Sequence, residues 1–259
     1  MAKNSPLALQ LTELRERIAA ACSKANRAVS EVTLIAVTKT AAPEQIREIL
    51  QLGVGDLGES RVQVLTQKVA QVNEFYQRQK ARGEVDVVAA LAPRLRWHMI
   101  GHLQRNKVKP ILPLVDFVHS VDSLRLAEEI EVAGGKIAKT TPVLLQINAS
   151  EEKSKFGVAV GASLHLAEQI ALMSNISLVG LMTMAPLDST AEESRVVFAR
   201  TREIFDEIKW NKYGGAGFKH LSMGMSNDFE AAIAEGATMI RIGTALFGGK
   251  TPDGDDSAE

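Results

Sequence analysis

The chain has 259 residues, of which 46% are apolar and 24% charged, and its 30 Lys and Arg residues nearly balance 31 Asp and Glu. This balance leaves no basic surplus for a nucleic acid or an anionic membrane surface, and the apolar runs are far shorter than the roughly 18 residues that a membrane span needs. Glu13, Arg15 and Arg17 interrupt the N-terminal region where a signal peptide would be apolar, so we expect a cytoplasmic protein. The single cysteine, Cys22, cannot form an internal disulfide and argues against a cysteine-based metal site.

Short apolar runs alternate with amphipathic segments along the chain. Leucines at helical spacing predict a first helix over residues 7–29. The predicted strands cover residues 32–38, 54–57, 96–100, 115–119, 143–147, 178–182, 219–223 and 238–242. The predicted helices between them cover residues 43–52, 61–73, 105–112, 123–133, 161–174, 191–210 and 226–235. This alternation predicts an α/β fold, a single (β/α)8 TIM-like barrel with an additional N-terminal helix.

No linker divides the chain, so we assign residues 1–252 to one barrel domain whose leading helix plugs or flanks the barrel. Residues 74–95 form a segment that is longer than most connections between a helix and a strand, and this segment could extend the preceding helix. Residues 253–259 are acidic and poor in apolar side chains, which predicts a disordered tail.

Lys39 is the first candidate functional residue, because it directly follows the apolar run of the first predicted strand. Active sites of such barrels lie at the carboxyl ends of the strands. Partial burial at the barrel mouth would make this lysine a Schiff-base nucleophile. The alternative is an ordinary solvated strand end.

Two loops after the seventh and eighth predicted strands suggest a phosphate site. Ser222 and Gly224 lie in the first loop, and Gly243 and Thr244 lie in the second. Small residues let backbone N–H groups approach an anion, and barrels frequently bind phosphate after these two strands. A simple helix-capping turn is the alternative for the first loop.

Arg241 is unusual because it interrupts a buried apolar strand, where a guanidinium needs an acceptor. An ordinary ion pair would supply one. If a pyridine ring lies above the barrel mouth, Arg241 can instead donate to the ring nitrogen and keep that nitrogen unprotonated.

Two other apparent motifs fail on their context. Residues 53–58 match G-x-G-x-x-G, but they run from a helix into a strand, whereas a dinucleotide-binding loop runs from a strand into a helix. His98 and His102 are four residues apart, yet the spacing crosses a strand end, which argues against a zinc pair.

Several motifs together resemble the YggS/PROSC family, the pyridoxal phosphate homeostasis proteins. The resemblance rests on six blocks in family order: IAVTKT at 35–40, LGESRVQ at 57–63, WHMIGHLQRNK at 97–107, QIN through KFG at 146–157, LSMGMS at 221–226 and RIGTALFG at 241–248. It implies a barrel like the N-terminal domain of alanine racemase that holds pyridoxal 5'-phosphate (PLP) on Lys39. Arg241 would face the ring nitrogen, and Ser222, Gly224, Gly243 and Thr244 would hold the phosphate.

The resemblance also implies a role in intracellular PLP homeostasis and amino-acid balance without catalytic turnover. PLP-requiring apoenzymes are then the expected partners, and we expect a monomer. Ser60 stands where the family usually has asparagine, and serine is too short to make the same amide contacts.

A PLP-dependent amino-acid racemase is the alternative function, and a Schiff-base aldolase without PLP is a third. A racemase of this fold needs a second acid-base group opposite the lysine. We expect none, because the predicted barrel uses up the chain and both tyrosines, Tyr76 and Tyr213, fall outside the predicted mouth.

Overall fold

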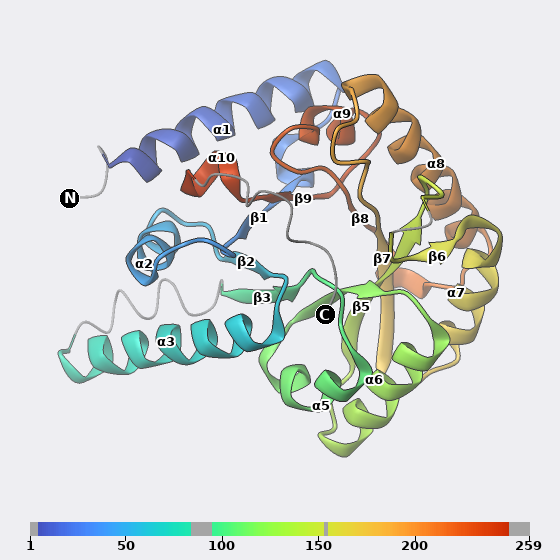
Figure 1. Ribbon diagram of the computed structural model, residues 1–259, viewed down its shortest axis with the longest axis horizontal. Coiled ribbons are helices and arrows are strands. Elements are labelled where there is room, and N and C mark those ends of the chain that lie inside the picture. Colours follow the sequence, from blue (N-terminus) through green and yellow to red (C-terminus); the bar gives the residue numbers. More distant parts are fainter. Residues whose placement is uncertain (1–4, 84–94, 153–154, 249–259) are drawn as a thin grey trace.

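The computed structural model describes residues 5–83, 95–152 and 155–248, and it contains a closed parallel barrel (Figure 1). Its strands are β1 (Thr33–Val37), β2 (Asp56–Glu59), β3 (Arg96–Met99), β4 (Phe117–Val121), β5 (Thr141–Asn148), β7 (Ile176–Met182), β8 (His220–Ser222) and β9 (Met239–Ile242). The barrel closes because β9 pairs with β1 and β4 pairs with β5. The predicted fold is confirmed.

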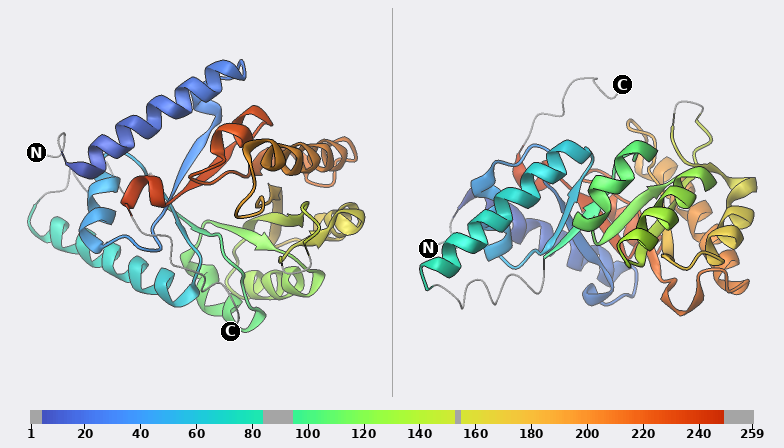
Figure 2. Two further views of the ribbon diagram at one scale, coloured as in Figure 1. Left: turned by 45° about the horizontal axis from the view of Figure 1, so that its top comes forward. Right: turned by 90° about the horizontal axis from the view of Figure 1, so that it is seen from below.

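A ring of helices surrounds the strands (Figure 2). They are α2 (Pro43–Gln51), α3 (Val62–Ala81), α5 (Val108–Ile111), α6 (Leu124–Lys136), α7 (Ser163–Ala171), α8 (Ala191–Trp210), α9 (Phe229–Ala234) and α10 (Thr244–Phe247). A two-residue strand, β6 (Val158–Ala159), adds to β5 outside the barrel. No helix in these described ranges is long and apolar enough to cross a membrane.

The leading helix, α1 (Pro6–Lys24), flanks the barrel and does not plug it: it packs against α9, α10 and α2 (Figure 1). Ser5 caps its first turn by accepting a hydrogen bond from the N–H of Ala8 (3.0 Å). The predicted end at residue 29 is wrong, because the chain turns at Asn26, which adopts a positive φ of 53°.

Two predicted strands are displaced by two residues. The sequence placed Val54 in a strand, but its N–H bonds the carbonyl of Ile49 and so completes the end of α2 (3.1 Å). The strand instead continues to Glu59, a charged residue that is buried. The fourth strand likewise starts at Phe117 and ends at Val121. Apolar character thus misplaced both strand boundaries.

Helix α3 extends the predicted helix to Ala81, so the first part of the 74–95 segment is helical. Residues 84–94 and the predicted tail at 253–259 lie outside the described residues.

Candidate functional site

Lys39 lies at the mouth of the barrel, directly after Thr38, whose N–H still bonds the carbonyl of Gly58 in β2 (3.0 Å). The Thr38 side chain is buried and bonds Glu59 on the helix side of the sheet. Because side chains alternate along a strand, the Lys39 side chain leaves the backbone on the opposite side of the sheet, toward the barrel interior at its mouth. Its side chain is exposed, and no described residue bonds or pairs with its amine. The structure therefore presents a free primary amine at this end of the barrel.

Thr38, Glu59 and Lys68 form a buried cluster beneath Lys39, which we call the Lys68 brace. The Lys68 ammonium lies 2.6 Å from Glu59 Oε1 and also donates to the Thr38 carbonyl. The Thr38 hydroxyl donates to the same carboxylate oxygen. The side chains of Glu59 and Lys68 are only 1% and 10% exposed. The brace fixes the backbone immediately before Lys39.

The sequence reasoning missed Glu59 and Lys68 as functional candidates. A signal was present in α3, where Lys68 falls on the buried stripe formed by Leu65, Val69 and Val72. A lysine in such a stripe requires a buried acceptor.

Arg241 faces the barrel interior, because its neighbours Ile240 and Ile242 pack in the core between strands and helices. Its side chain donates from Nη1 to Ser222 Oγ (2.7 Å) and from Nη2 to the carbonyl of Thr183 (2.9 Å). No carboxylate of the described chain forms an ion pair with it. Burial lowers the pKa of Arg241 to about 10, so the group remains a cation at neutral pH. Its other N–H donors can still serve a ligand.

The two loops predicted to hold a phosphate meet at the barrel mouth. The Thr244 hydroxyl lies 3.2 Å from Ser226 Oγ, and the N–H of Arg241 bonds the Gly224 carbonyl (3.0 Å). Gly224 has a φ of 92°, and a Cβ built there would lie 2.6 Å from the Cβ of Ala232. Only glycine fits this position. Gly243 directly precedes α10, so both predicted loops contribute small residues to one place.

Ser222 differs from the other residues predicted to hold the phosphate. It is the last residue of β8, it is fully buried, and its hydroxyl lies between Arg241 and Nδ1 of His119 (2.9 Å). The hydroxyl thus faces the barrel interior, beneath Arg241.

Two buried histidines continue this contact across the barrel. Nε2 of His119 lies 2.9 Å from Nδ1 of His98, and Nε2 of His98 lies 2.9 Å from Oδ1 of Asp56. Burial lowers the pKa of both imidazoles, well below the usual value for His119. The sequence reasoning did not single out His119, because a lone polar residue in a strand gives no indication of its partners.

His102 lies apart from His98. Its Nδ1 is 3.2 Å from Oδ2 of Asp122, and its ring stacks on Phe156 with centroids 4.0 Å apart. Within residues 5–83, 95–152 and 155–248, no group of three or more His, Cys, Asp or Glu side chains could hold a metal ion.

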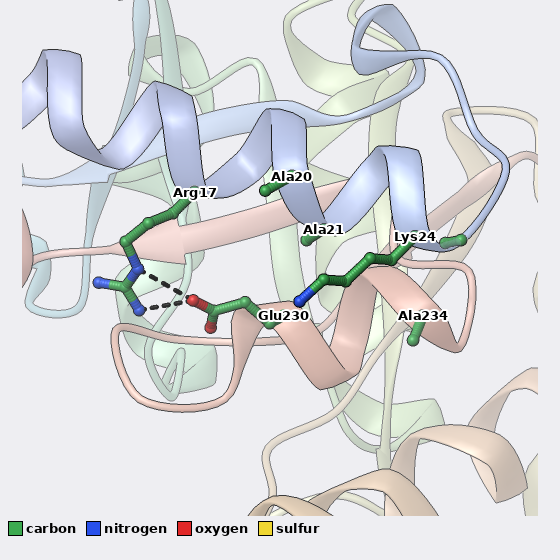
Figure 3. A pocket seen from close by; sticks show the side chains of 7 residues that line it. Arg17, Ala20, Ala21, Lys24, Glu230 and Ala234 are labelled. Carbon is green, nitrogen blue, oxygen red and sulfur yellow. Dashed lines mark hydrogen bonds and ion pairs between the residues drawn. The ribbon is translucent and has the colours of Figure 1, made fainter.

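A surface depression of about 300 Å³ lies outside the barrel, between α1 and α9 (Figure 3). Arg17 and Glu230 form an ion pair across it (2.6 Å), and alanines make up much of its wall. None of the predicted site residues lines it. It is therefore separate from the candidate site at the barrel mouth.

Comparison with known proteins places these features in a family. Residues 9–251 match the family described as "Alanine racemase, N-terminal domain". The pyridoxal phosphate homeostasis protein of Aquifex aeolicus is 39% identical over 239 residues, which are 92% of this chain and 96% of that protein. The chain belongs to the pyridoxal phosphate homeostasis protein family. The family member from Escherichia coli K12 is 33% identical over 251 residues, 94% of this chain and 97% of that protein.

Solved structures agree with this family assignment. The crystal structure described as that of an unknown protein from Bifidobacterium adolescentis has a TM-score of 0.82 at 34% identity, and the match covers 93% of this chain and 94% of that one. PipY of Synechococcus elongatus, solved with PLP bound, has a TM-score of 0.74 at 33% identity, covering 90% and 99%. An alanine racemase of Clostridium difficile shares the fold, with 16% identity and a TM-score of 0.65. The match covers 95% of this chain and 57% of the racemase chain.

Proposed function

We propose that this chain binds PLP as a Schiff base on Lys39 and takes part in intracellular PLP homeostasis and amino-acid balance without catalytic turnover. PLP supplies an aldehyde that condenses with a primary amine and releases water. Lys39 supports the proposal because its amine has no described partner and lies at the barrel mouth. PipY, a homologue of 33% identity, binds PLP.

The strongest support for the proposal is Arg241, because its surroundings suit the pyridine ring of PLP. Arg241 is 4% exposed, and within the described part of the chain its guanidinium bonds one hydroxyl and one carbonyl, which leaves donors for an uncharged acceptor. A pyridine nitrogen is such an acceptor. Because Arg241 does not give up its proton at neutral pH, the ring nitrogen bonded to it would stay unprotonated.

Gly224, Gly243 and Thr244 are the proposed phosphate ligands. Their support is the meeting of the two loops beside Arg241. Ser222 supports these ligands indirectly, because its hydroxyl is already bonded to His119 and Arg241 and its main chain pairs with Met182 of β7.

Absence of turnover is supported by the positions of the tyrosines. Tyr76 lies on α3 and Tyr213 follows α8, both in the outer helical layer. Neither offers an acid-base group opposite Lys39. We further propose a cytoplasmic monomer that exchanges PLP with PLP-requiring apoenzymes.

A PLP titration followed by absorption tests the proposal. We expect an imine band in the wild type and in Lys24→Ala, which removes an exposed lysine of α1, and no such band in Lys39→Ala. An equal band in Lys39→Ala would refute the Lys39 linkage. A parallel racemisation assay addresses the alternative: amino-acid racemisation that Lys39→Ala abolishes would make the protein a racemase.

A further inference from the structure

A continuous line of hydrogen bonds crosses the barrel from Arg241 to Asp56. Arg241 lies near the carboxyl end of β9, whereas Asp56 is the first residue of β2 and lies at the opposite end of the barrel. The links are Arg241 to Ser222 (2.7 Å), Ser222 to His119 (2.9 Å), His119 to His98 (2.9 Å) and His98 to Asp56 (2.9 Å). The three central residues are fully buried. We call this set the core relay.

The chemistry of its ends fixes the direction of every link. Arg241 can only donate. At the other end, burial opposes ionisation of Asp56, but hydrogen bonds from His98 and Arg96 outweigh it and lower the pKa of Asp56. A carboxylate can only accept, so His98 carries its proton on Nε2.

The remaining tautomers follow from that first assignment. A neutral His98 with its proton on Nε2 has an acceptor at Nδ1, so His119 donates from Nε2. His119 then has an acceptor at Nδ1, and the Ser222 hydroxyl donates to it. This leaves a lone pair of Ser222 for Arg241. All four bonds therefore point from Arg241 toward Asp56.

Other charges around the histidines favour the neutral forms. The positive charge of Arg96 disfavours protonation of His98. Arg241 and His220 have the same effect on His119. Asp56 and Asp116 oppose this at His98, but burial is the largest effect. Neutral rings allow only the single direction above.

We infer that His119 and His98 are positioning residues for the cofactor, which orient Ser222 as an acceptor and thereby fix Arg241 beneath the pyridine ring. This inference rests on the proposed function and extends it to residues in the barrel interior. Asp56, at the far end of the barrel, sets the direction. Without the hydrogen bond to Ser222, the Arg241 side chain would adopt several rotamers and would lose its contact with the pyridine ring.

The tautomers are tested first, on the full chain without PLP, by side-chain ¹⁵N–¹H NMR of its histidines at pH 7. We expect His98 and His119 to be neutral with the proton on Nε2. A proton on Nδ1 of His119, or an imidazolium at His98, would overturn the inference. This result does not depend on PLP, so it stands apart from failure of the Lys39 linkage.

Two buried serines provide a matched pair for the second test. Ser222→Ala breaks the relay, whereas Ser120→Ala removes a buried hydroxyl that has no hydrogen-bond partner among the described residues. We expect Ser222→Ala to shift the absorption maximum of bound PLP and to raise the Kd about tenfold, and Ser120→Ala to change neither. The Ser222→Ala loss should be equal for pyridoxal, which lacks the phosphate. Equal behaviour of the two variants, or a loss confined to PLP, would refute the role.

A conservative rescue at His119 separates positioning from packing. The amide oxygen of His119→Asn can replace Nδ1 as the acceptor for Ser222, whereas His119→Phe fills the space without an acceptor. We expect His119→Asn to keep PLP affinity within about threefold and His119→Phe to lose about tenfold. Equal losses in the two variants would assign His119 a packing role only.

Discussion

Removal of the Lys68 ammonium should show how much the buried brace stabilises the site. Lys68→Met keeps the length and apolar stem of the side chain. Of the described partners of the Glu59 carboxylate, which is 1% exposed, it leaves the Thr38 hydroxyl. Breaking one side of a buried ion pair costs about 3–5 kcal/mol. We therefore expect the free energy of unfolding to fall by about that amount in urea titrations.

A matched control lies on the same helix. Arg78 pairs with Glu74 at 2.5 Å, but both side chains are more than half exposed, so Arg78→Met should cost less than about 1 kcal/mol. The double change Lys68→Met with Glu59→Leu should recover much of the loss, because no unpaired charge remains. Equal costs for Lys68→Met and Arg78→Met would refute the brace.

Three further predictions follow from the site and its surroundings. Arg241→Met should weaken PLP binding at least tenfold in equilibrium dialysis while the barrel stays folded; unchanged binding contradicts the ring contact. Gly224→Ala should destabilise the protein by about 1–3 kcal/mol in thermal unfolding, because φ is 92° and the new Cβ meets Ala232. Gly161→Ala should not, because no atom of the described residues lies within 4 Å of a Cβ at that position. Burial, together with the nearby charge of Lys219, lowers the pKa of His220 to about 4. The unfolded chain therefore binds more protons than the folded chain between pH 6.5 and 4, and the free energy of unfolding should fall as the pH drops through this window. His220→Gln should make this fall smaller.

The barrel was predictable because its cause is local. Each buried parallel strand is a short apolar run, each helix has an apolar stripe, and the alternation determines the topology. Lys39 and Arg241 were found for a related reason, since each is a charged residue at or within an apolar strand.

The brace and the core relay were not predictable in this way. His119 and Ser222 are 103 residues apart and come from β4 and β8, so only closure of the barrel brings them together. Ser222 was predicted to hold the phosphate, yet the alternation of side chains along β8 turns its hydroxyl toward the barrel interior. Apolar character alone also gave the wrong end for β2. Its last residue, Glu59, is charged but buried, because Lys68 of the next helix pairs with it.

Mass spectrometry of the borohydride-reduced protein would identify the residue that holds PLP. Reduction converts an imine into a stable amine. The cofactor therefore remains attached to its lysine when the protein is digested into peptides. We expect one pyridoxyl adduct, on the peptide that contains Lys39. Unmodified protein after incubation with PLP, or an adduct on another lysine, would contradict this expectation.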